Sequence, residues 1–112
     1  MGWASHYIDQ LMDGETVSFR PSGRSMSGII ESGQLCTVEP VDPKTVQAGD
    51  IVLCRVGRNE YLHTVKLVSE EKTPVFGVLV KGRRYQIGNN HGRINGWIGA
   101  NKIFGKLKEV TP

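Results

Sequence analysis

Short apolar runs separated by glycine, proline and asparagine make up nearly all of the sequence after Gly14, and this texture restricts the fold more than any other feature. Runs of this kind are typical of β-strands, and the predicted strands are residues 16–20, 34–39, 51–56, 61–68, 75–80, 84–87 and 103–110. Tight turns are predicted at Gly57-Arg58-Asn59 and at Lys81-Gly82, and residues 88–96 are predicted to form a loop. Because the fourteen glycines and five prolines fall mainly at these joints, we expect a mainly β fold, either a β-barrel or a two-sheet coil.

The first residues have a different pattern, which predicts a short N-terminal helix. Four apolar residues fall at the spacing of one helix face: Trp3, Tyr7, Ile8 and Leu11. The Asp13-Gly14 pair predicts the end of this helix. A chain of 112 residues fits one domain, so we divide residues 1–112 into an N-terminal helix over 1–13 and a β core over 16–108.

The composition is that of a soluble protein, and no membrane partner is expected. No apolar run reaches the ~20 residues that cross a bilayer, and no basic-then-apolar signal pattern is present, so the expected location is cytoplasmic. Cys36 and Cys54 lie in alternating apolar stretches, and we expect them to be small buried side chains. Without a Cys-x-x-Cys pair the sequence gives no support to a metal site, and no cofactor is expected.

Positive charge is concentrated after residue 80. The cations of this segment face a single acid, Glu109, and they are Lys81, Arg83, Arg84, Arg93, Lys102, Lys106 and Lys108. Such a cluster would suit an acidic partner such as nucleic acid, but no helix-turn-helix pattern is visible and aromatic residues are not interleaved as in RNA-binding motifs. We therefore interpret the cluster as a solvated basic face and do not expect nucleic-acid binding.

The stretch from Pro21 to Gly28 is where chemistry is most expected. A strand ends there, and the glycines around Ser25 permit unusual backbone angles and leave backbone N–H groups near its hydroxyl. Nucleophilic catalysis needs an exposed hydroxyl with N–H donors aimed at the developing oxyanion. Ser25 is therefore a candidate nucleophile, and a plain Ser-Gly turn is the alternative interpretation.

A series of motifs gives a resemblance to one family, and the motifs are Ser22-Gly23-Arg24-Ser25-Met26, Glu31-Ser32-Gly33-Gln34, Ala48-Gly49-Asp50-Ile51-Val52-Leu53 and Tyr61-Leu62-His63-Thr64-Val65. In this order they closely resemble the catalytic domain shared by LexA- and UmuD-type self-cleaving proteins and type I signal peptidases. The resemblance continues into the closing strand and covers about residues 16–108. It implies a LexA/signal-peptidase-like fold, a peptide or protein substrate, Ser25 as the nucleophile, and a general base on the return strand of a hairpin.

In most of this family the general base is a lysine, but the matching position here is His63, as in the signal peptidases of the endoplasmic reticulum and archaea. Histidine has an ordinary pKa near ~6.5, so it needs little desolvation to be neutral at pH 7. Strand alternation places one set of residues on the same face, namely Tyr61, His63, Val65 and Leu67. Lys66 is expected on the opposite face unless a bulge intervenes, which favours His63 as the base. A strand histidine satisfied by a backbone carbonyl is the alternative.

Support for His63 is predicted from the segment 88–97. This segment is similar to one in the histidine-type signal peptidases whose acidic residues support the histidine, and the matching positions here are Asn89 and Asn95. An asparagine can orient an imidazole through its carbonyl oxygen, but it cannot stabilise the imidazolium by charge. The alternative is that these asparagines simply supply turn conformations.

Two functions of different classes follow. The leading hypothesis is a soluble serine endopeptidase with a Ser25–His63 dyad, whose oxyanion hole combines the N–H of Ser25 with a donor from Ser22, Gly23 or Arg24. The alternative is a catalytically degenerate domain, for instance phage-encoded, that binds a peptide or protein as a regulatory module. The repressor branch of the family also suggests a homodimer. Because the sequence shows no cleavage segment, DNA-binding domain or membrane anchor, self-cleavage and export processing are not expected.

Overall fold

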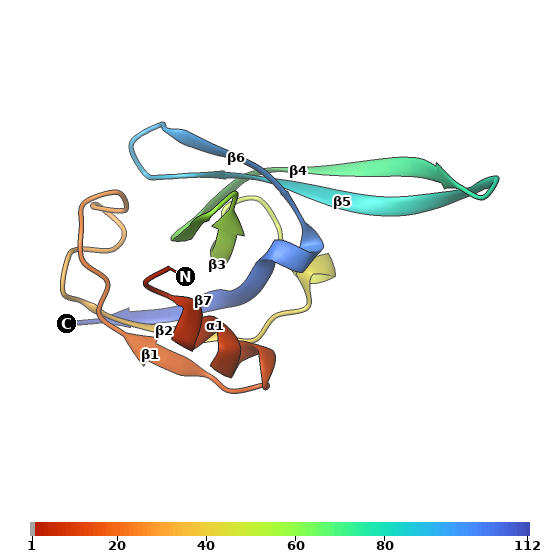
Figure 1. Ribbon diagram of the computed structural model, residues 1–112. Coiled ribbons are helices and arrows are strands. Elements are labelled where there is room, and N and C mark those ends of the chain that lie inside the picture. Colours follow the sequence, from red (N-terminus) through yellow and green to blue (C-terminus); the bar gives the residue numbers. More distant parts are fainter. Residues whose placement is uncertain (1) are drawn as a thin grey trace.

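One antiparallel sheet and a short helix form the computed structural model, which describes residues 2–112 (Figure 1). The elements in chain order, with η for a short 3-10 helix, are α1 Ser5–Met12, β1 Val17–Phe19, β2 Leu35–Glu39, η1 Pro43–Thr45, β3 Ile51–Val56, β4 Asn59–Val75, β5 Val78–Gly88, β6 Ile94–Gly99, η2 Ala100–Lys102 and β7 Ile103–Thr111. Within this described part of the chain the strand order is β1-β2-β7-β3-β4-β5-β6, and all neighbours are antiparallel. The predicted mainly β fold with a short N-terminal helix is confirmed.

The sheet is coiled, but it does not close into a barrel. In Figure 1 the β1-β2-β7 half lies below the β4-β5-β6 half, and α1 lies against the lower half. The edge strands β1 and β6 are not paired with each other, and β1 has only three residues with which to form a ladder. Of the two arrangements that the sequence predicts, the closed barrel is therefore not formed.

Strand β3 lies in the middle of the sheet and is buried on both faces. Ile51 and Leu53 belong to a first core, which α1 covers, whereas Val52 and Cys54 belong to a second core beneath β5 and β6. Burial on both faces explains why this strand is a continuous apolar run instead of an alternating one. Cys36 and Cys54 are free and buried, as predicted, and burial raises the pKa of Cys54 to about 12.

The longest hairpin differs from the prediction in the position of its turn. From Leu67 onward strand β4 pairs continuously with β5 out to Val75 and Val78, so the turn lies at Phe76-Gly77, and Lys81-Gly82 stands inside β5. Both turn residues have positive φ, 50° and 78°, a backbone shape that Asn-Gly adopts far more often than Phe-Gly. Residues 69–73 are all polar because this ribbon has no buried face. Without alternating apolar residues, the sequence indicates a break between strands at this place.

Part of the segment predicted as a loop is a strand. Strand β6 begins at Ile94 and pairs with β5, so the irregular connection is confined to residues 89–93. Asn95 and Gly96 conceal the strand in the sequence because neither residue favours strands. Gly96 is required here, since its φ is +150° and a Cβ would come within 3.0 Å of Val56 Cγ1. Asn95 is thereby held on a strand rather than in a loop.

Candidate active site

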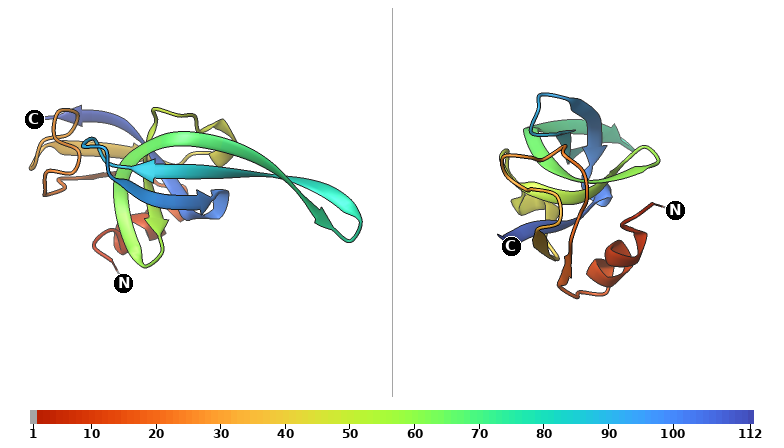
Figure 2. Two further views of the ribbon diagram at one scale, coloured as in Figure 1. Left: turned by 90° about the horizontal axis from the view of Figure 1, so that it is seen from above. Right: turned by 90° about the vertical axis from the view of Figure 1, so that its left-hand side faces the viewer.

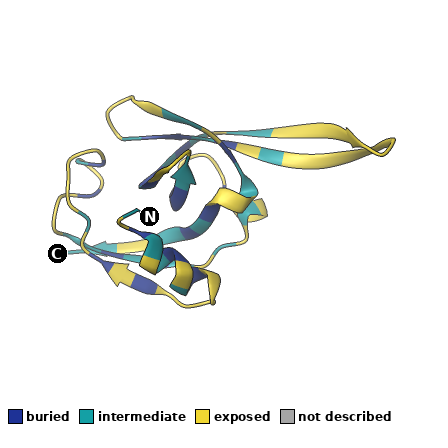
Figure 3. Ribbon diagram, in the orientation of Figure 1, coloured by how far each residue is buried: buried dark blue, intermediate teal, exposed yellow. Residues whose placement is uncertain are grey.

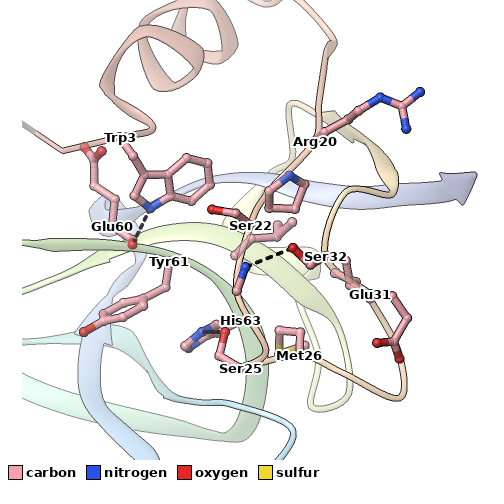
Figure 4. Close-up of a pocket in the computed structure, with 14 residues that line it drawn as sticks. Trp3, Arg20, Ser22, Ser25, Met26, Glu31, Ser32, Glu60, Tyr61 and His63 are labelled. Carbon is pink, nitrogen blue, oxygen red and sulfur yellow. Dashed lines mark hydrogen bonds between the residues drawn. The ribbon is translucent and has the colours of Figure 1, made fainter. Parts of the chain in front are cut away.

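Ser25 lies in a tight turn within the connection between β1 and β2 (Figure 4). Met26 and Ile30 are buried in the first core, and the N–H of Ile30 donates to the carbonyl of Met26 at 2.7 Å. Ser25 itself is exposed. Because Met26 and Ile30 anchor the turn in the core, Ser25 is held at the protein surface.

His63 lies on β4, opposite Val52 of β3, and is only 5% exposed. Its Nε2 is 3.0 Å from the Oγ of Ser25 (Figure 4), and its Nδ1 is 2.7 Å from the Oδ1 of Asn95 on β6. The ring of Tyr61 stacks on the imidazole with the ring centroids 4.6 Å apart. Three segments that are distant in sequence thus bring a serine, a histidine and an asparagine into one hydrogen-bonded row.

The hydrogen bonds of His63 determine which of its nitrogens carries the proton. Because the carbonyl oxygen of Asn95 only accepts, Nδ1–H donates to it, and the lone pair of Nε2 faces the hydroxyl of Ser25. Burial holds the pKa of His63 below its ordinary value of 6.5, the charge of Lys66 acts in the same direction, and the Asn95 hydrogen bond opposes them. At pH 7 the imidazole is therefore neutral and oriented to accept the proton of Ser25.

A β-bulge around Lys66 interrupts the alternation of β4. Beyond the bulge Leu67 is 53% exposed, so the prediction that Leu67 shares a face with His63 is wrong. The Lys66 side chain packs over Gly88, where an added Cβ would lie 3.0 Å from its Cε. The hydrogen-bond partner of Ser25 Oγ is His63 and not Lys66, although the bulge leaves the lysine close enough for its charge to affect the imidazole.

The two asparagines predicted to support the histidine have different roles. Asn95 contacts His63 directly, as described above. The Oδ1 of Asn89 instead accepts the backbone N–H groups of His91 at 2.8 Å and Arg93 at 3.0 Å. The prediction that Asn89 supports His63 is therefore wrong, because its side chain organises the turn between β5 and β6.

That turn also fastens the loop that carries Ser25. The N–H of Asn90 donates to the Ser25 carbonyl at 2.9 Å, and its side-chain amide donates to the Ser27 carbonyl at 2.7 Å. The Nε2–H of His91 donates to the Arg24 carbonyl at 2.8 Å and lies 2.9 Å from the Oγ of Ser27. We call these bonds the loop clasp. Sequence reasoning missed it, because an Asn-His pair in an irregular turn carries no signal of which distant loop it meets.

Loss of the loop clasp should lower the rate at which Ser25 is acylated, with only a small effect on the melting temperature. In His91→Ala the loop that carries Ser25 loses hydrogen bonds of about 1 kcal/mol each. We therefore expect the rate at which Ser25 reacts with an activated acyl ester to fall about tenfold. The measurement is the acylation rate constant at fixed pH, together with the melting temperature. His6→Ala, an exposed histidine on α1, is the control. Equal acylation rates in the two variants would contradict this role for His91.

A pocket of about 370 Å³ opens beside Ser25 and His63 (Figure 4). Apolar side chains that also belong to the first core line its base, and they are Met26, Ile30 and Leu62. Polar and charged side chains surround them, and these are Arg20, Ser22, Glu31 and Ser32. Ser25 and His63 thus border a pocket that can hold an apolar side chain with polar groups around it.

The donors predicted for an oxyanion hole are not equally placed. Ser22 and Gly23 line the pocket with Ser25, but the N–H of Gly23 donates to the Oγ of Ser32 at 3.3 Å. Arg24 does not line the pocket, and its carbonyl is held by the loop clasp. Within residues 2–112 the N–H of Ser25 and the hydroxyl of Ser22 have no protein acceptor, so these two donors are available to a ligand.

The N-terminal segment forms one wall of the pocket. Trp3 was predicted to lie on the helix, but it precedes α1, lines the pocket and donates its Nε1–H to the Glu60 carbonyl at 2.9 Å (Figure 4). The Glu60 carboxylate is buried and accepts from Ala4 N at 2.7 Å, Ser5 Oγ at 2.9 Å and Arg55 Nε at 2.9 Å. Burial alone would raise the pKa of Glu60, but these bonds hold it below its ordinary value. The carboxylate therefore ties the N-terminus to the strand that carries His63.

Within residues 2–112 no three His, Cys, Asp or Glu side chains gather in a way that would hold a metal ion. What the site does contain is an exposed hydroxyl, a buried neutral imidazole and an amide in contact with each other. The chain matches no protein-family model and no curated protein.

Proposed function

We propose that this protein is a serine endopeptidase in which Ser25 is the nucleophile and His63 the general base. The observation that carries the proposal is the 3.0 Å contact between the exposed Ser25 Oγ and the buried Nε2 of His63, whose tautomer leaves Nε2 free to accept. The motif series that resembles LexA/UmuD-type proteins and signal peptidases supports the same assignment, because it identifies the same two residues.

In the proposed reaction, Oγ of Ser25 attacks the carbonyl carbon of a peptide bond while its proton moves to Nε2 of His63. The resulting oxyanion accepts hydrogen bonds from the Ser25 N–H and the Ser22 hydroxyl. The intermediate then collapses, the C–N bond breaks, and His63 returns the proton to the leaving amine. Water repeats the sequence on the acyl-enzyme, with its proton passing to His63 and then back to Ser25. Asn95 holds the imidazole in orientation throughout, without adding a negative charge.

An extended peptide is the substrate that best suits this pocket. The segment Pro21–Gly23 lines it and belongs to no strand. The Pro21 carbonyl accepts from the Gly33 N–H, and the Gly23 N–H donates to Ser32. The N–H and carbonyl of Ser22 and the carbonyl of Gly23 are therefore the backbone groups left for an incoming chain. A peptide added there would be held by main-chain hydrogen bonds and would place one side chain over the apolar base. The preference would then be for a small or medium apolar side chain beside the cleaved bond.

A peptide-binding module without catalysis is the second candidate, and the neutral side chain of Asn95 favours it. A carboxylate in that place would stabilise the imidazolium that forms when Ser25 is deprotonated, and an amide does not. Both candidates use the same pocket. They differ in whether Ser25 forms a covalent acyl bond.

Acylation of Ser25 distinguishes the two candidates. The protein is incubated with an activated acyl ester, and the modified residue is mapped by mass spectrometry in the wild type, in Ser25→Ala and in Ser18→Ala, a control on β1 outside the pocket. We expect acylation at Ser25 in the wild type and the Ser18 variant and none at that turn in Ser25→Ala. A peptide library analysed in parallel should show cleavage that requires Ser25. Binding of peptides by a wild type that is neither acylated nor active would contradict the peptidase.

A further inference from the structure

The outer part of the β4–β5 hairpin is an arm that projects away from the cores. We define the arm as residues 69–84, in which Ser69 pairs with Arg84 at the base and Val75 with Val78 next to the turn. Figures 1 and 2 show it extending well beyond the other strands, and Figure 3 shows its surface as exposed. All residues from 70 to 82 are exposed, so the arm contributes nothing to either core.

The end of the arm is apolar in spite of its full exposure. Its large apolar side chains are each at least 42% exposed, and they are Val75, Phe76, Val78, Leu79 and Val80. These make up five of the eleven large apolar residues that are exposed in the described part of the chain. Such a concentration on a monomer's surface indicates an interaction site, since scattered single residues would need no explanation.

The apolar residues cover both faces of the ribbon and its end. Val78, Leu79 and Val80 are consecutive on β5, so their side chains alternate between the two faces. Phe76 is fully exposed at the turn between the strands. A folded protein partner would cover one face of such a ribbon and leave the other in water. An apolar medium that surrounds the tip would cover all of it.

Positive charge lies directly behind the apolar tip. Lys72 and Lys81 are paired across the two strands, and no acid lies between them and the turn. Like charges in directly opposed positions destabilise a sheet, so this pair is favoured when an anion lies between or beside the two ammonium groups. Farther back, Glu70 and Glu71 face Arg83 and Gly82, and the Arg83 guanidinium donates to backbone carbonyls of the body, including that of Val46 at 2.7 Å.

The distance between the apolar tip and the Lys72–Lys81 pair matches the layers of a lipid interface. Lys72 lies three residues before Val75, where the strand pairing ends, which at ~3.3 Å per residue places the lysines roughly 10 Å behind that end of the ladder. Apolar groups of interfacial proteins reach ~5–10 Å into the headgroup and acyl boundary, with cations at the level of the phosphates.

We infer that the arm docks this protein on a bilayer that carries anionic headgroups. The tip from Pro74 to Val80 enters the interface, and Lys72 and Lys81 meet the lipid phosphates. No helix within residues 2–112 is long and apolar enough to cross a membrane, and docking through a hairpin tip requires none. The lack of a spanning segment or a signal pattern, from which no membrane partner was expected, does not bear on a hairpin tip. This inference is independent of the proposed peptidase activity.

Co-sedimentation of the full chain with lipid vesicles tests the inference. The vesicles are phosphatidylcholine alone or an equal mixture with phosphatidylserine, at low and high salt. We expect binding to the mixed vesicles, weakened by salt, and at least about tenfold weaker binding to phosphatidylcholine alone. The double variant Phe76→Ser/Leu79→Ser should lose binding to both vesicles, and Lys72→Ser/Lys81→Ser should lose only the preference for anionic lipid. Met12→Ser, which removes an equally exposed apolar side chain from α1, should bind as the wild type does.

Two outcomes would overturn the inference. One is equal sedimentation of the wild type and the Phe76/Leu79 variant at the same melting temperature. The other is a wild type that ignores both vesicles but self-associates through the tip, as shown by sedimentation equilibrium in which only the tip variant is monomeric. That result would assign the arm to a second copy of the chain. Because the tip packs on neither core, these substitutions should leave the fold intact, and circular dichroism checks that they do.

Discussion

Replacing His63 by alanine is expected to slow the acylation of Ser25 by at least about 1000-fold. Without the imidazole, the proton of the Ser25 hydroxyl has no acceptor within reach, since Nε2 of His63 is the side-chain group bonded to that oxygen. The measurement is the second-order rate constant for acylation by an activated ester. Ser25→Ala sets the background, and a double variant of both residues should be no slower than either single one.

The pH dependence of the same rate provides an independent check on His63. Its folded-state pKa is lowered, first by burial, so the neutral form persists below the ordinary value of 6.5. The acylation rate should therefore be constant around neutral pH and decrease only when the pH falls through the lowered pKa. An acid limb centred above 6.5, or its persistence in His63→Ala, would show that another group is the base.

Replacing Asn95 by aspartate is the second change with a large expected effect, and it should speed the acylation of Ser25. A carboxylate at the position of Oδ1, 2.7 Å from Nδ1, stabilises the imidazolium and should raise the pKa of His63. The acid limb of the rate profile should move upward with that pKa. Above it, a stronger base should increase the plateau rate about tenfold.

Asn89→Asp is the matched control for this substitution. It introduces the same charge in the turn that precedes β6, but the side chain at this position accepts backbone N–H groups of the turn and does not contact His63. We expect its acid limb to move little, while the Asn95 variant shows the full shift. Equal shifts of the acid limb in both variants would mean that His63 responds to any added negative charge nearby and not to a contact with residue 95. No shift in the Asn95 variant would contradict the contact between this residue and the imidazole.

The parts of the fold that the sequence predicted well are those with a buried face. Strand β3 was placed within its correct bounds because both of its faces are apolar, and β2 and β7 were recovered nearly as well. The strands of the arm were not predicted correctly, because neither face of the arm is buried and no alternation of apolar and polar residues marks it. Its turn was also missed, because phenylalanine is not a typical turn residue. Strand β6 was not predicted because Asn95 and Gly96 have low strand propensity; in the structure Asn95 contacts His63 and Gly96 packs closely against Val56.

The site was predictable only where local pattern determines position. Period-two alternation on β4 favoured His63 over Lys66, and His63 is the residue that contacts Ser25, but no pattern revealed the bulge. Asn95 was one of two candidates, because the segment around it offers several asparagines and the fold alone decides which one meets the imidazole. His91 was beyond sequence reasoning, since its contact with the Ser25 loop spans 67 residues and depends on how the sheet coils.

The unclosed sheet has a consequence for how reactivity and stability are related. Ser25 comes from the half that begins with β1, and His63 and Asn95 come from the half that ends with β6. No strand ladder joins these halves along the open side. They are joined there by hydrogen bonds of side chains and turns, and we call this set of bonds the seam. A bound peptide that spans the seam would draw the nucleophile and base together and stiffen the molecule at once. Conversely, damage to the seam would separate the reacting atoms while both cores stay folded.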